Sequence, residues 1–134
     1  MKQLNKIWLL IVVGFIFSGC VSAPGIKQFN STKYTIAGKR IEIAALWHIQ
    51  PDCENFGLPI IQVISAPKNG KVDLGTKRIF PSDTAYKRCR STKVNGPVAY
   101  YTANSGFKGT DTIKLRFAYS DGVLEEKTLT IIVK

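Results

Sequence analysis

The sequence predicts an all-β protein built as a single antiparallel β-sandwich of about seven strands. Its 134 residues fit one domain. Short runs alternate between apolar and polar residues, and turn residues recur roughly every 8 to 12 positions. No helical period of any length is present. Hydrophobic residues make up 45% and charged residues 21% of the chain, which excludes a fully disordered protein and a collagen-like fibre.

The chain begins with the three parts of a secretory signal. Lys2 and Lys6 give a basic start, an apolar run occupies residues 7–17, and Ser18 and Gly19 are small. At about 1.5 Å per residue, this run covers only about half of a roughly 30 Å hydrocarbon core. We therefore expect residues 1–19 to be a signal peptide that is removed.

The residues at the end of this segment, Phe17-Ser18-Gly19-Cys20, resemble the lipobox of bacterial lipoproteins, although the family usually has Leu in place of Phe17. The resemblance implies that Cys20 becomes the first residue and carries a diacylglyceryl thioether and an amide-linked acyl chain such as palmitate. Two or more acyl chains give stable anchoring to a membrane. The alternative is an ordinary signal peptide cut near Cys20 or Ala23, which leaves a soluble secreted protein.

The residue after the lipobox bears on the location. Val21 is not the Asp that retains lipoproteins of the enteric type at the inner membrane. The resemblance therefore favours the outer membrane of the bacterial cell envelope, with the domain in the periplasm.

Residues 20–33 are small and polar and show no sustained period, so we expect a short flexible tether that carries the lipid. The sandwich domain is then predicted over residues 34–134. Removal of residues 1–19 takes away Lys2 and Lys6, so 17 of the 19 basic residues remain against 9 acidic ones. The mature chain is strongly basic.

The strands are predicted from period-two alternation and from β-branched and aromatic residues. In order, they are residues 41–49, 59–65, 71–74, 77–80, 97–102, 112–119 and 129–133. In the first of them Ile43, Ala45 and Trp47 share the face that is expected to point inward. The turn residues 67–70 predict a hairpin between the second and third strands, and Asp121-Gly122 predicts a closing hairpin. Residues 81–93 are expected to form a polar loop.

The stretches 101–113 and 117–122 look like the closing portion of bacterial cadherin-like and Ig-like surface modules, with their Phe-x-Gly-x-Asp pattern. The resemblance implies an Ig-like sandwich. Gly109 would supply a backbone conformation that penalises side chains, Asp111 would accept hydrogen bonds from nearby backbone N–H groups, and Phe107 would close one end of the core. This pattern is a property of the fold and predicts no active site.

Once Cys20 is assigned to lipid, Cys53 and Cys89 remain as an even pair in an oxidising compartment, where a disulfide is expected. A loop of this length predicts about 4 kcal/mol of stabilisation. A redox or nucleophilic thiol is the alternative, but neither cysteine lies in a CxxC motif. Trp47 precedes Cys53, so the bridge differs from that of antibody domains, and we expect it to pin loops at one end of the sandwich.

One segment concentrates positive charge and is the candidate contact surface. Its members are Tyr86, Lys87, Arg88, Arg90 and Lys93. Guanidinium groups bind phosphate or carboxylate. The alternative is a solvated loop in a generally basic protein, because cations also occur elsewhere along the chain.

No cofactor or metal is expected. The five Asp residues are isolated, with no calcium-binding spacing. A zinc site at His48, Asp52 and Cys53 would need the thiolate assigned to the disulfide, so His48 is expected to face solvent from a strand. A single histidine excludes a multi-histidine site within one chain, and the common nucleotide-binding and hydrolytic motifs are missing.

These observations lead us to expect a lipid-anchored envelope lipoprotein that works as a binding or adaptor module rather than as an enzyme. Its partners would be the membrane, through Cys20, and an envelope protein or anionic envelope polymer, with nucleic acid not expected. One alternative is an inhibitor or accessory subunit of an envelope machine. Another is an envelope hydrolase whose acidic pair is assembled only by folding.

Overall fold

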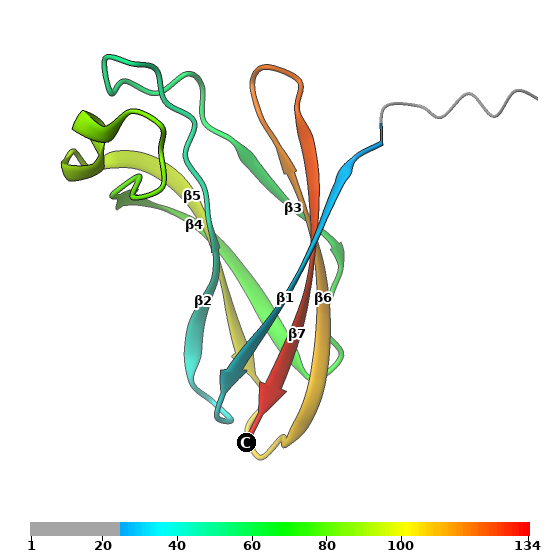
Figure 1. The fold of residues 1–134 in the computed structure, drawn as a ribbon. Helices are drawn as coiled ribbons and strands as arrows, with labels where there is room; N and C mark the ends of the chain where they lie inside the picture. The colour runs from blue at the N-terminus through cyan, green and yellow to red at the C-terminus, as the bar shows by residue number, and fades with distance from the viewer. Residues whose placement is uncertain (1–24) are drawn as a thin grey trace, which may run out of the picture.

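The structure, a computed structural model, describes residues 25–134 and confirms the predicted all-β sandwich. Within this range, seven strands form two facing sheets, and one short 3₁₀ helix lies between the fourth and fifth strands (Figure 1). The elements are β1 (Lys27–Thr35), β2 (Arg40–Ala45), β3 (Ile60–Ser65), β4 (Gly70–Ile79), η1 (Lys87–Ser91), β5 (Val94–Ala103), β6 (Gly109–Ala118) and β7 (Leu124–Val133).

The strand order follows an Ig-like plan. Strands β2, β5 and β4 form one sheet, and β3, β6 and β7 form the other, which β1 extends to four strands. The groups 2-5-4 and 3-6-7 correspond to the two sheets of an immunoglobulin sandwich. The ladders are antiparallel except for that between β1 and β7, which is parallel. The Ig-like architecture implied by the closing pattern is therefore present.

Strand β1 corrects the expected boundary between tether and domain. The sandwich begins at Lys27 rather than at Tyr34, because residues 27–35 pair with residues 125–133 of β7. Most side chains of β1 are exposed, so no apolar period marks this strand in the sequence. The predicted signal peptide, Cys20 and the first part of the predicted tether, up to residue 24, lie outside the described residues.

The core lies between the sheets and is formed by alternate residues of the central strands. Tyr101, Ile113, Leu115, Leu129 and Ile131 are completely buried there. Burying an aliphatic side chain of this size contributes about 1.5–3 kcal/mol to folding. The predicted closing hairpin is confirmed, because β6 and β7 pair along their whole length.

Strand β2 departs from the predicted alternation because it contains a bulge. The register shifts between Glu42 and Ala44, so that Ile43 and Ala44 are both buried. The bulge moves the inward face by one residue. Leu46 is consequently buried just after the strand, whereas Trp47 is only half-buried.

The predicted hairpin between residues 59–65 and 71–74 is wrong. Strand β3 pairs with β6 in one sheet, and β4 pairs with β5 in the other, so the turn between them crosses from sheet to sheet. The two short strands predicted at 71–74 and 77–80 form the single strand β4, whose ten residues all have partners in β5.

The Phe-x-Gly-x-Asp pattern has the roles expected of it. Gly109 has a φ of 140°, and Phe107 packs against the main core. Asp111 is buried and accepts hydrogen bonds from the backbone N–H groups of Lys68 and Asn69, each at 2.9 Å. The Tyr101 hydroxyl donates to the same carboxylate at 3.0 Å. Asp111 thus holds the β3–β4 turn against β5 and β6.

Candidate functional site

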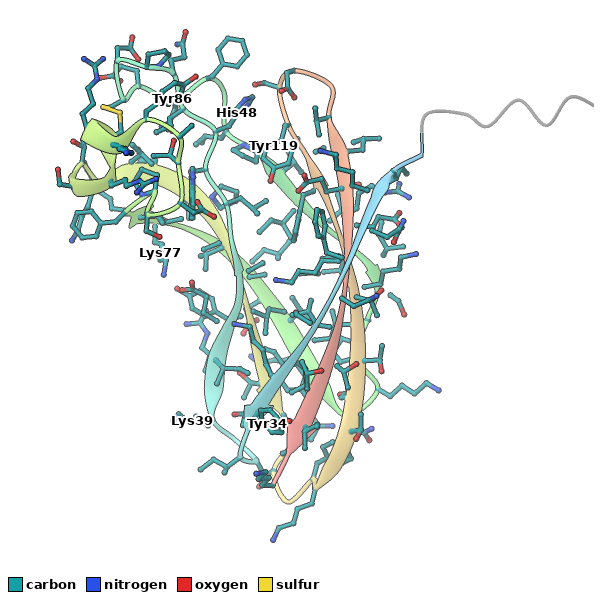
Figure 2. The ribbon with its side chains drawn as sticks, in the orientation of Figure 1. Tyr34, Lys39, His48, Lys77, Tyr86 and Tyr119 are labelled. Carbon is teal, nitrogen blue, oxygen red and sulfur yellow. A yellow bond between two sulfur atoms is a disulfide. The ribbon has the colours of Figure 1, made fainter. Side chains whose placement is uncertain are left out.

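The two ends of the sandwich carry the candidate binding residues. The loop end consists of residues 46–59, 80–93 and 119–123. The turn end consists of residues 36–39, 66–69, 104–108 and Lys134. Figure 2 shows Tyr86, His48 and Tyr119 at the loop end, and Tyr34 and Lys39 at the opposite end.

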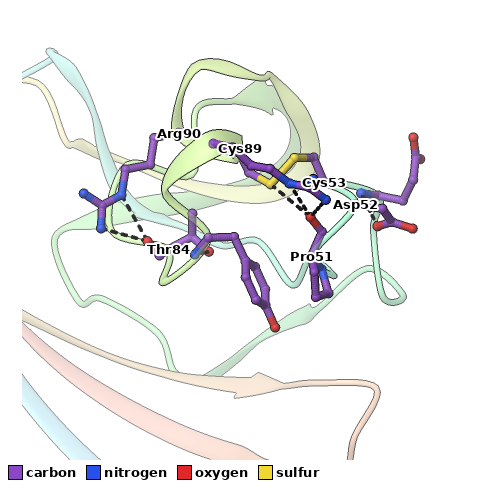
Figure 3. The surroundings of a disulfide bond; sticks show 9 residues. Pro51, Asp52, Cys53, Thr84, Cys89 and Arg90 are labelled. Atoms are coloured by element: carbon purple, nitrogen blue, oxygen red, sulfur yellow. Dashed lines mark hydrogen bonds between the residues drawn. A yellow bond between two sulfur atoms is a disulfide. The ribbon is translucent and has the colours of Figure 1, made fainter.

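The disulfide between Cys53 and Cys89 is confirmed and lies at the loop end (Figure 3). It joins the β2–β3 connection to η1, with 5.3 Å between the two Cα atoms. Cys89 is completely buried and forms a small second core with Ile49 and Val94. The bridge therefore orders two connections that have little apolar surface of their own, as the sequence predicted.

The two arginines of the predicted contact segment donate hydrogen bonds to backbone carbonyl oxygens of the loop end. The Arg88 guanidinium donates to the carbonyl oxygen of Pro51, from Nε at 2.7 Å and also from Nη2. Arg90 donates from Nε and Nη2 to the Thr84 carbonyl oxygen at 3.0 and 2.9 Å (Figure 3). These donors are used within the domain, although each guanidinium keeps its charge and its remaining N–H groups.

All five members of the segment are exposed, the two arginines included. Tyr86 shows 38% of its surface, and Lys87 has no ion pair among residues 25–134. Lys93 places its Nζ 5.1 Å from the centroid of the Phe80 ring. The structure thus gathers the predicted residues at one end.

Exposed acidic residues share the loop end with these cations. They are Asp52, Glu54, Asp83 and Asp121. The loop end therefore presents mixed charge, and the local positive field is weaker than the segment 86–93 suggests when it is considered alone.

His48 forms a cluster that the sequence did not predict. Its Nδ1 lies 3.1 Å from the Ser120 hydroxyl oxygen, and its Nε2 lies 3.6 Å from the Asp121 carboxylate. The ring makes edge contacts with Phe56 and Tyr119. His48 is thus half-buried in a loop rather than exposed on a strand, because β2 ends at Ala45.

The cluster has the residue types of a Ser–His–Asp triad but a different hydrogen-bond direction. The Ser120 hydroxyl donates its single proton to the Phe56 carbonyl oxygen. It therefore accepts from His48 Nδ1, whereas an activated serine must donate to its histidine base. The arrangement ties the β6–β7 turn to the β2–β3 connection.

Tyr119 lies beside this cluster and lines an open hollow of about 280 Å³ together with Trp47 and Asp83. Burial raises the pKa of Tyr119 to about 12, and the nearby Glu125 carboxylate acts in the same direction. The phenol consequently stays protonated near neutral pH, and its hydroxyl donates to Glu125 at 3.4 Å.

The turn end carries a second group of cations that the sequence analysis did not single out. Lys39, Lys68, Lys108 and Lys134 come from four separate segments, and each is exposed. A usable sequence clue exists, because successive strands of the sandwich run in opposite directions and every second connection therefore lies at the same end. Lysines in the first, third and fifth connections are therefore expected to lie together.

Within residues 25–134, no group of three or more His, Cys, Asp or Glu side chains is arranged to hold a metal ion. In the same range, no helix has the length and apolar character needed to cross a membrane. Neither a scan against protein-family models nor a search of curated proteins finds a match for this chain. Arguments about function therefore rest on the residues and their placement.

Proposed function

We propose that this chain is a lipid-anchored lipoprotein of the bacterial cell envelope, with outer-membrane placement favoured, and that it acts as a non-catalytic binding or adaptor module. The lipobox-like residues 17–20 support the anchor, and the Cys53–Cys89 disulfide is consistent with an oxidising compartment. The Ig-like sandwich supports the binding role, since such folds present loops and edges on a fixed frame.

The observation that carries the proposal is the place where the chain enters the sandwich. Residues 25–27 border residues 122–124 of the β6–β7 hairpin, at the loop end of the molecule (Figure 1). Lys27 follows Cys20 by seven residues, a distance of at most about 25 Å when fully extended. A lipid on Cys20 therefore holds the loop end near the bilayer and leaves the turn end pointing away from it.

Anchoring supplies the mechanism. Restriction to a membrane surface raises the effective concentration of the domain for any partner at the same surface, so weak contacts become sufficient. The domain has two surfaces that could contact such a partner, namely the exposed residues of segment 86–93 and the unpaired edge of strand β3. That edge contains no charged residue from Ile60 to Ser65, and Ile60 and Ile64 are 58% and 43% exposed. Such an edge suits the addition of an extended strand.

A second candidate, an inhibitor or accessory subunit of an envelope machine, is favoured by the rigidity of the loop end. The disulfide and the two arginine braces fix η1, and Tyr86 stands exposed at its start. A fixed protrusion of this kind could fill a site on a partner with little loss of entropy. The hydrolase alternative gains no support from the Ser120 cluster, because its hydroxyl proton is donated to a carbonyl.

Cross-linking in intact cells, followed by mass spectrometry of the captured partner, tests the proposal. Wild-type protein is compared with Cys20→Ser at matched abundance. We expect at least about tenfold weaker capture by the variant, because the effective-concentration gain is lost. Equal capture by both proteins would show that anchoring has no part in binding. Turnover of an envelope substrate by the purified protein would replace the binding role with a catalytic one.

A further inference from the structure

Positive charge at the turn end is not balanced by neighbouring carboxylates. Lys39, Lys68 and Lys108 lie on three different turns, and none forms an ion pair among residues 25–134. Arg40 adds a fourth cation, stacked 3.8 Å from the centroid of the Tyr100 ring, and Lys134 adds a fifth, above Tyr34.

The carboxylates near this end are already engaged. Asp73 pairs with Lys71 at 3.4 Å. Asp111 is only 3% exposed and accepts the hydrogen bonds from Lys68, Asn69 and Tyr101 described above. Glu42, which lies level with Asp73 across β5, forms an ion pair with Lys77. The loop end differs, because four exposed acidic side chains accompany its cations.

The turns are fixed to one another, so their cations occupy a defined surface. Gly38 donates its N–H to the Ala103 carbonyl oxygen at 3.2 Å, and Asn104 donates to Asn69 at 2.8 Å. The N–H of Lys134 bonds to the Thr35 carbonyl oxygen at 2.9 Å. A ligand that bridges the turns would therefore not have to order them first.

A polar hollow of about 270 Å³ lies beside one of these cations. Ser65, Lys68, Thr110 and Thr112 line it, and Asp111 forms part of its wall. Three hydroxyl groups and one ammonium group provide donors for a phosphate or carboxylate group. Asp111 is only 3% exposed, and its oxygens accept hydrogen bonds from two backbone N–H groups and from Tyr101.

We propose that the turn end is a binding site for a linear polyanion. The hollow beside Lys68 holds one phosphate or carboxylate group, and the other turn-end cations contact further groups along the polymer. This inference deepens the proposed function and rests on it in one respect. Because the anchor enters at the loop end, the turn end faces away from the bilayer that holds the protein.

The composition of the surface favours a polymer over a folded acidic protein. Lysine is depleted at protein–protein interfaces, whereas contact with a polyanion depends on cations that displace its counterions. At the turn end, all four cations that lie on turns or at the chain terminus are lysines.

The test measures binding of the processed full-length protein, in uncharged detergent, to long-chain polyphosphate and to poly-L-glutamate. The two probes separate phosphate from carboxylate recognition. The variant Lys68→Gln/Lys108→Gln is compared with Lys27→Gln/Lys127→Gln, which removes the same charge from the β1–β7 ladder, away from the turn end and from segment 86–93. Thermal melting of both variants confirms folding, since none of the four side chains is buried.

We expect the turn-end variant to bind one or both polymers about tenfold more weakly, and the slope of log K against log salt concentration to fall by about 1 to 2. The Lys27→Gln/Lys127→Gln variant should change affinity by less than about twofold. A Thr110→Val variant should weaken binding as well, because it removes a hydroxyl group from the hollow.

Equal losses in the two double variants would show attraction by net charge alone and would overturn the inference. Failure of both polymers to bind would do the same, as would turn-end-dependent binding to phosphatidylglycerol vesicles or to an acidic protein in place of the polymers. The proposed function is tested separately. If the protein isolated from cells carries no lipid on Cys20 but still binds polymer through the turn end, the anchor is refuted and this binding site is retained.

Discussion

Asp111 shows how one residue organises the sandwich. Its buried carboxylate accepts hydrogen bonds from the turn that joins the two sheets and from Tyr101 in the opposite sheet. The sequence predicted bonds from Asp111 to backbone N–H groups. It could not identify Lys68 and Asn69 as the donors, because they lie more than 40 residues earlier and reach Asp111 only when the sheets close.

Replacement of Asp111 by alanine should lower the free energy of unfolding by about 2–4 kcal/mol, because the buried Tyr101 hydroxyl and two turn N–H groups lose their acceptor. Urea denaturation followed by circular dichroism measures the change. Asp73→Asn is the control, since Asp73 forms only an exposed ion pair worth up to about 1 kcal/mol. A loss for Asp111→Ala no larger than for the control would contradict the role assigned to this carboxylate.

Glu126 is the second buried acidic residue on which the sheet depends. It lies on the outer side of β7 beneath Lys114, Gln28 and Arg116, with Arg116 Nη2 at 2.7 Å. The hydrogen bonds from these three side chains, that from Lys114 foremost, lower the pKa of Glu126 to about 2. A lowered folded-state pKa stabilises the fold above the unfolded pKa near 4.5 and ceases to do so as the pH falls toward 2.

We therefore expect the wild-type protein to lose stability between about pH 4.5 and pH 2. Glu126→Gln should be less stable at neutral pH, and the difference from wild type should shrink through that same interval. Denaturation midpoints over pH 2–7 measure both curves, with Glu125→Gln as a neighbouring control. Parallel curves for wild type and Glu126→Gln would exclude Glu126 as the source of the acid sensitivity.

Among the elements, the loop end depends most on covalent support. Its small core consists of Ile49, Cys89 and Val94, whereas the main core lies between the central strands. The bridge closes a span of 36 residues, which in the chain-entropy description contributes about 4 kcal/mol.

The double variant Cys53→Ala/Cys89→Ala should unfold at lower denaturant concentration, with a loss of up to about 4 kcal/mol. Hydrogen exchange should accelerate mainly in residues 46–58 and 80–93, while the β6–β7 hairpin keeps its protection. Uniform acceleration through all strands would mean that the bridge supports the whole sandwich rather than the loop end.

Elements with strict alternation could be predicted from the sequence, and the others could not. In β6 and in the second half of β7 the buried residues recur at every second position, so these parts and the turn between the strands were predicted correctly, whereas residues 124–128 of β7 were missed. The exposed strand β1 carries no such pattern because its pairing is through the backbone. The bulge in β2 and the sheet-to-sheet crossing after β3 depend on neighbours that local sequence does not specify.

On the scale of the whole molecule, the sandwich has two unlike ends. Residues 25–27 enter the sandwich at the loop end, where the disulfide and the hydrogen bonds of two arginines fix exposed side chains of mixed charge. The turn end lies at the far side and carries lysines without acidic partners. Under the proposed function, a lipid on Cys20 would lie nearer the loop end and would leave the turn end free for the proposed polyanion.

The candidate site was only partly predictable, because contacts between segments that are distant in sequence are not specified by the local sequence. The pairing of Cys53 with Cys89 followed from their number and compartment. The cations of segment 86–93 were visible as a cluster in the sequence, but their neighbours were not. Arg88 and Arg90 donate hydrogen bonds to the carbonyl oxygens of Pro51 and Thr84, and loops with exposed acidic residues lie beside them. The turn-end lysines are far apart in sequence and become neighbours only through the fold.

The most direct test of the account is the intact mass of the processed protein recovered from fractionated cells. We predict a chain that begins at Cys20, carries a diacylglyceryl group and an amide-linked acyl chain, sediments with the membranes, and has Cys53 and Cys89 oxidised. A chain found in the soluble cytosolic fraction, with an unmodified Cys20 and reduced Cys53 and Cys89, would contradict the anchor, the compartment and the proposed role together.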